Sequence, residues 1–206
     1  MPEPREAGVE RLLAFSDAVF AIAVTLLVLD LREPDVPHGL LAALIAQWPS
    51  YLGYVLSFLI VGIIWALHHR VFQIIRRTDY VFILINVVFL MWVAVVPFPT
   101  AILSSYLENP SEQQTAVAIY AGLFVVGSLL GNLLWRYAIH RDRLLGAQVD
   151  RAAVRKLTVA FAAGPVLNLV ALALSFVNPP ATIALILIIN LFFAVAPLLP
   201  LDRWIG

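Results

Sequence analysis

The sequence predicts an all-α membrane protein that consists of one domain with six transmembrane helices. Hydrophobic residues make up 62% of the 206 positions and charged residues only 13%, whereas soluble domains contain about half and about a quarter of these classes. A single soluble core of this size cannot bury so much apolar surface. The apolar residues also gather into stretches of membrane-spanning length, so a lipid bilayer is the solvent that accepts them.

A helix needs about 20 apolar residues to cross a hydrocarbon core of about 30 Å. Six stretches meet this requirement, over residues about 12–31, 51–69, 80–103, 116–139, 157–177 and 182–201. The shorter apolar piece Leu40–Trp48, which Pro49 separates from the second span, is expected to form an interfacial or re-entrant helix. Pro97 and Pro99 are expected to kink or end the third helix.

The basic residues predict the orientation of these spans. All Lys and Arg residues except Arg32 fall on the side of the membrane that carries both termini. Because such residues are enriched in cytoplasmic loops, we expect a multi-pass protein of the inner (plasma) membrane with both termini in the cytoplasm. The opposite face is net negative and is expected to attract cations. Its acidic residues are Asp30, Glu33, Asp35, Glu108 and Glu112.

Composition also argues against several functions. Thirteen basic residues balance thirteen acidic ones, which argues against nucleic acid as a partner. The chain has no cysteine, so disulfides and thiolate metal sites are excluded. No Gly-x-Ser-x-Gly, His-Glu-x-x-His or paired-aspartate motif lies in the spans. We therefore expect neither an enzyme nor a cofactor.

The first span carries the most informative residues. Asp17 lies inside it, where an ionisable group is costly unless it is paired or hydrogen-bonded. Two interpretations stay open: Ser16 and Asp17 fasten this helix to polar groups of neighbouring helices, or Asp17 binds an ion or relays a proton. At about 100° per residue, Leu26 and Leu29 lie within about 40° of Ile22, whereas Asp17 points about 140° away from Ile22. This separation favours the fastening role.

The motif Arg11-x-x-x-Phe15-Ser16-Asp17, continued by Ala-Val-Phe-Ala-Ile-Ala-Val-Thr-Leu-Leu-Val-Leu, resembles the signature of the transmembrane protein 175 family of potassium channels. The second span, with Ser-Phe-Leu-Ile-Val-Gly-Ile-Ile-Trp at 57–65 and His-His-Arg-Val-Phe at 68–72, resembles the corresponding family segment. This resemblance implies a homotetramer of single six-helix repeats, in which the first helices line a central pore.

The resemblance also assigns roles to individual residues. Ile22 matches the narrowest hydrophobic ring of the pore, Thr25 a position associated with potassium preference, and Leu26 and Leu29 further apolar pore positions. The motif residues match an interhelical polar network: Arg11, Phe15, Ser16 and Asp17. Candidate partners of that network are Trp65, His68, His69 and Asn86. His68 and His69 are typical of interfacial or hydrogen-bonded histidines, or one of them joins Asp17 and Arg11 in a proton-sensitive network.

The resulting hypothesis is a potassium-selective channel that conducts passively, with no bound metal apart from the permeating K+. The chain lacks a Thr-Val-Gly-Tyr-Gly loop, so a dry Ile and Leu constriction is expected in place of a filter of carbonyl groups. The alternative is a proton-coupled secondary transporter that uses Asp17 or a histidine. Internal halves typical of such transporters are not evident in the sequence.

Overall fold

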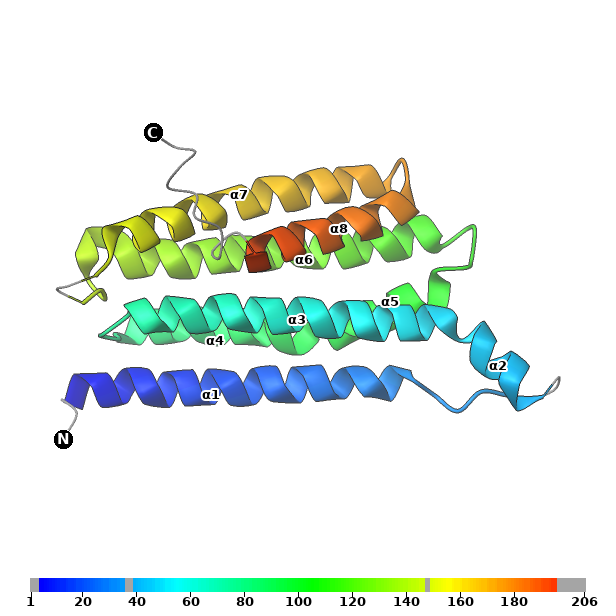
Figure 1. The fold of residues 1–206 in the computed structure, drawn as a ribbon, viewed down its shortest axis with the longest axis horizontal. Coiled ribbons are helices and arrows are strands. Elements are labelled where there is room, and N and C mark those ends of the chain that lie inside the picture. Colours follow the sequence, from blue (N-terminus) through cyan, green and yellow to red (C-terminus); the bar gives the residue numbers. More distant parts are fainter. Residues whose placement is uncertain (1–3, 36–38, 147–148, 196–206) are drawn as a thin grey trace.

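The computed structural model describes residues 4–35, 39–146 and 149–195, and these residues form a bundle of helices (Figure 1). Outside the helices, one isolated antiparallel bridge joins Ile75 and Leu145. The elements in chain order are α1 Pro4–Leu26, the 3-10 helix η1 Leu27–Asp30, α2 Leu40–Ala46, α3 Trp48–Ile74, α4 Tyr80–Val95, α5 Pro97–Tyr106, α6 Gln113–Ile139, the 3-10 helix η2 His140–Asp142, α7 Arg151–Ser175 and α8 Pro179–Val195. The predicted all-α class is confirmed.

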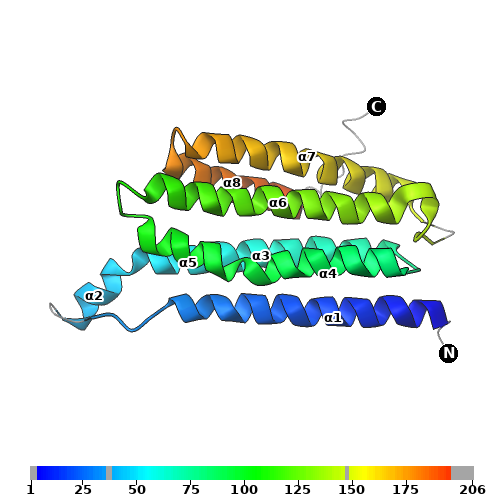
Figure 2. The same cartoon turned by 180° about the vertical axis from the view of Figure 1, so that it is seen from behind.

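The helix α1 forms one edge of the bundle. The helices α3, α4 and α5 lie next to it, and α6, α7 and α8 lie on the far side (Figures 1 and 2). The first helix packs mainly against α3 and α4, whereas α6 contacts α4, α5, α7 and α8. One side of α1 therefore has no neighbour among the described residues of the subunit.

Five helical segments are long and apolar enough to cross a membrane, namely Ala7–Asp30, Trp48–Ile74, Tyr80–Tyr106, Gln113–Asp142 and Arg151–Ser175. They contain most or all of each of the first five predicted spans, which supports a multi-pass protein. The apolar α8 has 17 residues, or about 25 Å of helix. The predicted sixth span, 182–201, continues into residues 196–201, which lie outside the described residues, so its crossing stays a prediction.

Helix boundaries differ from the predicted spans at several ends. The first helix begins at Pro4 rather than near residue 12, and α3 continues to Ile74 rather than ending near residue 69. Helical hydrogen bonding does not stop at the hydrocarbon boundary, whereas the apolar pattern does. The third span consists of α4 and α5, because Pro97 lacks the amide hydrogen that would continue the helix. The kink predicted there is confirmed, as is the short helix α2.

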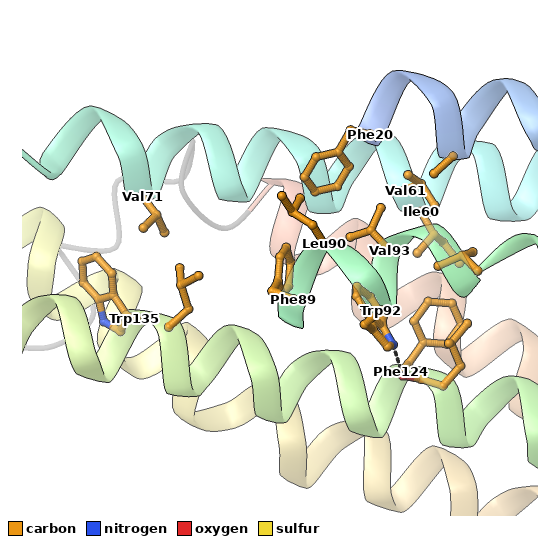
Figure 3. Close-up of a cluster of buried hydrophobic side chains, with 14 of the residues drawn as sticks. Phe20, Ile60, Val61, Val71, Phe89, Leu90, Trp92, Val93, Phe124 and Trp135 are labelled. Atoms are coloured by element: carbon orange, nitrogen blue, oxygen red, sulfur yellow. Dashed lines mark hydrogen bonds between the residues drawn. The ribbon is translucent and has the colours of Figure 1, made fainter. Parts of the chain in front are cut away.

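Aromatic side chains fill the centre of the subunit (Figure 3). Phe89 and Trp92 of α4 face α6, where Phe124 lies opposite them. The indole Nε1 of Trp92 donates a hydrogen bond of 2.8 Å to the carbonyl oxygen of Leu123. Phe20 is the aromatic side chain that α1 contributes to this core, and it is only 2% exposed. The core therefore joins α1 to the helices behind it.

The two ends of the bundle carry different charges. The end where α1 begins also holds the last turns of α3 and α6 and the first turn of α7 (Figure 2). Arginines lie at this end, in these helices and in the segments that connect them: Arg70, Arg76, Arg77, Arg136, Arg141, Arg143, Arg151 and Arg155. The other end holds α2 and the connection from α5 to α6, with Glu108 and Glu112. Arg203, which the sequence places with the basic end, lies outside the described residues. This separation follows the charge division expected from the sequence.

Asp79 fastens the basic end by capping α4. One carboxylate oxygen accepts a hydrogen bond of 2.8 Å from the Phe82 amide, and the other accepts one of 2.8 Å from the Tyr137 hydroxyl. Arg143 Nη2 lies 3.6 Å from the same carboxylate. Burial raises the pKa of Asp79, but these hydrogen bonds and the charge of Arg143 lower it by more. The net pKa is therefore below its ordinary value.

Candidate functional site

The helix α1 and the 3-10 helix η1 that continues it have two faces with different surroundings. The face toward α3 and α4 is buried and consists of Val9, Leu12, Ser16, Phe20, Ala23 and Leu27. The opposite face is exposed in the subunit and consists of Arg11, Phe15, Ala18, Ile22, Thr25 and Leu29. These exposed residues are separated alternately by four and three positions, which is the spacing of a seam along which helices pack against one another. We call this face the α1 seam.

The four residues matched to pore positions lie on or beside the α1 seam. Ile22 is 60% exposed and Leu29 69% exposed, and Leu26 is also exposed. The Thr25 hydroxyl donates a hydrogen bond of 2.9 Å to the Ile22 carbonyl oxygen. Because this bond uses the hydroxyl hydrogen, the oxygen lone pairs of Thr25 stay available to accept a hydrogen bond or to coordinate a cation.

A chain of hydrogen bonds fastens the buried face of α1 to α3 and α4. The Ser16 hydroxyl donates to the Leu12 carbonyl oxygen (2.8 Å) and accepts from Asn86 Nδ2 (3.0 Å). The amide oxygen of Asn86 is 2.9 Å from Nε2 of His68. All three polar side chains of this chain, Ser16, Asn86 and His68, are buried. Three distant segments thus meet in one polar connection, whose members satisfy one another away from water.

Asp17 has a different partner. Its Oδ1 accepts a hydrogen bond of 2.8 Å from the indole Nε1 of Trp65, and the Trp65 ring contacts that of His69 at 5.8 Å between centroids. Asp17 lies beside the α1 seam rather than on it, because it is five residues from Ile22 on the helix. The carboxylate is therefore held against α3.

Arg11 is the motif residue that the structure does not bring into this arrangement. Its side chain is exposed on the α1 seam, and it makes no hydrogen bond or ion pair with a described residue of the subunit. Phe15 is likewise 53% exposed. Of the four motif residues, Ser16 and Asp17 thus bind neighbouring helices, whereas Arg11 and Phe15 face outward.

Sequence reasoning missed a second buried polar cluster, toward the opposite end of the bundle. The Ser57 hydroxyl lies 2.8 Å from Thr100 Oγ1 and 2.9 Å from the hydroxyl of Tyr120. All three residues are fully buried. Single hydroxyl residues are common in membrane helices, so nothing in the sequence showed that these three meet.

The described residues contain no group of three or more His, Asp or Glu side chains that could hold a metal ion. What the arrangement offers instead is one exposed, mostly apolar helix face backed by a polar attachment. A face of this kind can line a path for ions when several subunits present it to one another, because much of each side chain is exposed in the subunit.

Comparison with known proteins decides the family. A family model described as the endosomal/lysosomal potassium channel TMEM175 matches residues 11–97, which contain most of α1 and its partners α3 and α4. A potassium channel of Chamaesiphon minutus is 42% identical over 199 residues, covering 94% of this chain and 96% of that protein. The chain belongs to the TMEM175 family. This membership places it among ion channels rather than enzymes, as expected.

A second potassium channel and a solved structure support the same family. A potassium channel of Streptomyces collinus is 43% identical over 176 residues, which cover 84% of this chain and 85% of that protein. The crystal structure of a lysosomal potassium-selective channel TMEM175 homolog from Chamaesiphon minutus superposes with a TM-score of 0.83 at 38% identity. That alignment covers 92% of this chain and 98% of the homolog. The helix arrangement is therefore that of the TMEM175 fold.

Proposed function

We propose that this protein is the subunit of a passive potassium-selective channel of the inner (plasma) membrane. Four copies form the channel, and the α1 seam of each copy lines the central pore. Two relatives that align over most of their length are named potassium channels, and the α1 seam is the observation in this chain that carries the proposal. Both termini face the cytoplasm, in keeping with the basic end of the bundle.

The α1 seam suits a pore because its residues lie in one line along the helix. The helix is attached to its own subunit on the opposite side, through Ser16 and Phe20. Four seams can therefore face one axis while each helix stays held from behind. Asp17 faces Trp65 instead of that axis, which suits a fastening role rather than the relay of a proton.

In this arrangement the four Ile22 side chains form the narrowest part of the pore. Such a ring excludes water, and an ion inside it loses hydration without gaining ligands. The Thr25 hydroxyl oxygens lie about one turn farther along and return part of the lost coordination. The preference for K+ over Na+ then follows from the smaller cost of dehydrating K+. Leu26 and Leu29 continue the apolar wall toward the outer mouth, where acidic residues attract cations.

The decisive experiment measures K+ flux into liposomes for the wild-type protein, Ile22→Asn and Val28→Asn. Ile22→Asn is expected to raise the flux severalfold, because a polar side chain keeps the constriction wet. Val28 is 47% exposed in η1, which continues α1, but points about 120° away from Ile22 around the axis, so Val28→Asn is expected to leave the flux unchanged. Absence of K+ flux in the wild type, or equal fluxes in all three, would overturn the proposal.

Two further measurements test the assembly and the mode of transport. Because the chain has no cysteine, Ile22→Cys introduces a single thiol, and oxidation should link neighbouring subunits in a complex whose native mass is that of four chains. A complex of another size contradicts the tetramer. Accumulation of K+ against its gradient, driven by a pH difference, would contradict the channel and favour the proton-coupled secondary transporter.

A further inference from the structure

Each subunit contains a cavity of about 110 Å³ among α3, α4, α6, α7 and α8, which is partly open at the subunit surface and lies on the side away from the α1 seam. Five of the residues that line it carry Phe or Trp rings, namely Phe89, Trp92, Phe124, Phe161 and Phe193. Four lining residues are polar, namely His68, Ser128, Asn168 and Asn190, and the rest are aliphatic or glycine. Figure 3 shows the rings of Phe89, Trp92 and Phe124 facing one another between α4 and α6. A cavity of this size approaches the engineered cavity of about 150 Å³ in another protein that stays dry and binds benzene.

Glycines leave this space open. Gly127, Gly131 and Gly164 line the cavity. A Cβ at Gly127 would collide with the ring of Trp92, and one at Gly131 would lie 3.3 Å from the ring of Phe161. Small residues at these places allow α6 and α7 to pack while the rings keep a gap between them.

Two buried polar atoms of the lining residues have no hydrogen-bond partner in the described part of the subunit. Asn168 is 6% exposed and His68 is 4% exposed, and both line the cavity. Asn168 donates from Nδ2 to the Gly164 carbonyl oxygen at 2.9 Å, while its Oδ1 is buried and unpaired. Nδ1 of His68 is also buried and unpaired. An unsatisfied buried polar atom costs free energy that a suitable ligand recovers.

Both unpaired atoms are hydrogen-bond acceptors. Asn86 uses its Nδ2 to donate to Ser16, so its amide oxygen accepts from Nε2 of His68. Neutral His68 therefore carries its hydrogen on Nε2 and has a bare lone pair on Nδ1. Asn168 likewise offers a carbonyl-type oxygen. The cavity thus presents aromatic side chains and acceptors without a matching donor.

We propose that this cavity is a binding site for a small, ring-sized apolar molecule that carries one O–H donor, of the phenol class. The ring packs against the aromatic side chains, and the hydroxyl donates to Asn168 Oδ1, which is buried and unpaired. The other polar lining residues, Ser128 and Asn190, already donate hydrogen bonds of 2.8 Å to carbonyl oxygens of their own helices. The site is separate from the pore and lies within one subunit.

The experiment compares phenol with toluene, which has the same shape but no O–H donor. Binding to the purified full-length protein in micelles is measured by competition in ligand-observed NMR and by the shift in Tm. Phenol is expected to bind about three- to tenfold more tightly than toluene, the ratio that corresponds to one net hydrogen bond. Asn168→Leu keeps the volume but removes one acceptor, so it should lower this ratio. Equal affinities in the wild type, or an unchanged ratio in Asn168→Leu, would overturn the proposal.

A variant that fills the cavity tests where the two probes bind. Ala160 lines the cavity, so Ala160→Phe should abolish binding of both probes. Val159, its neighbour on α7, is 60% exposed and lies outside the cavity lining, so Val159→Phe should leave binding unchanged. Binding of phenol to Ala160→Phe would contradict the site. If Ala160→Phe does not fold, the ratio of phenol to toluene affinity in Asn168→Leu decides whether the proposal holds. All readouts measure binding, so their outcome is independent of whether the protein conducts K+.

Discussion

The buried and exposed faces of α1 are both mostly apolar, yet their surroundings differ. Phe20, on the buried face, contacts the rings of His68 and Phe89 at centroid distances of 5.4 and 6.3 Å. Ile22, two residues later, is 60% exposed in the subunit. Hydrophobicity alone does not distinguish these faces, because lipid accepts apolar side chains as readily as a protein core does. What distinguishes them is which neighbours they meet.

The polar residues make the same contrast sharper. The Ser16 hydroxyl accepts a hydrogen bond from Asn86 of α4, whereas the Thr25 hydroxyl donates one to a carbonyl oxygen of its own helix. The buried face therefore holds α1 to its subunit. The exposed face is left free for other subunits and, in the proposed channel, for ions.

The largest expected effect comes from removing an aromatic ring of the buried face, and removing one of the exposed face is the control. Phe20→Ala should lower the free energy of unfolding by about 3 kcal/mol, near the lower end of the range for buried Phe. The lower end applies because lipid replaces water and mainly packing is lost. Phe15, 53% exposed, is the matched control, and Phe15→Ala should change subunit unfolding by less than about 0.5 kcal/mol. Unfolding by denaturant in micelles checks both, and equal losses would show that the two faces are equivalent.

A smaller effect comes from removing one hydroxyl on each face. Ser16→Ala leaves the amide hydrogen of Asn86 without its acceptor and should cost about 1–2 kcal/mol of unfolding free energy. Thr25→Ala should leave unfolding almost unchanged but lower the ratio of K+ to Na+ permeability, because the oxygen beside the constriction is lost. Unfolding curves and ion permeability ratios measure the two effects. A permeability change in Ser16→Ala equal to that in Thr25→Ala would contradict the division of tasks.

The smallest expected effect comes from Asp79, which attaches α4 to α6 at the aqueous end of the bundle instead of within the membrane. The pKa of Asp79 is lowered in the folded state, so its carboxylate stabilises the fold above the pKa of the unfolded chain. That stabilisation is lost as the pH falls through the folded pKa. Asp79→Asn keeps a helix cap and should cost about 0.5 kcal/mol at neutral pH, as expected for an exposed ion pair.

The measurement is the difference in unfolding free energy between wild type and Asp79→Asn as a function of pH. The difference should shrink toward acid pH and vanish once the carboxylate is protonated in both states. A difference that grows toward acid pH has the wrong sign. The comparison of Asp79→Asn with Ser16→Ala tests whether a polar attachment contributes more to the free energy of unfolding when it is shielded from water.

Much of the fold could be predicted from the sequence. Apolar stretches located the first five membrane helices, and Pro97 located the break in the third span, because both depend on local chemistry. The apolar piece Leu40–Trp48 is too short to cross, and it begins with the short helix α2. Helix ends were less predictable, since α1 and α3 continue past their apolar stretches. The candidate site was predicted in part: the positions of Ile22 and Asp17 on different sides of α1 follow from the helical period.

The sequence by itself thus determined that the chain spans a membrane, how its charges divide, and which residues of α1 share a face. Only the tertiary structure decided which face is buried, that Ser16, Asn86 and His68 meet, and that a cavity lies behind them. The physical reason is that helical period relates residues on one helix but says nothing about its neighbours. In a membrane protein every face is apolar, so the surroundings of each face come from packing between helices far apart in the chain.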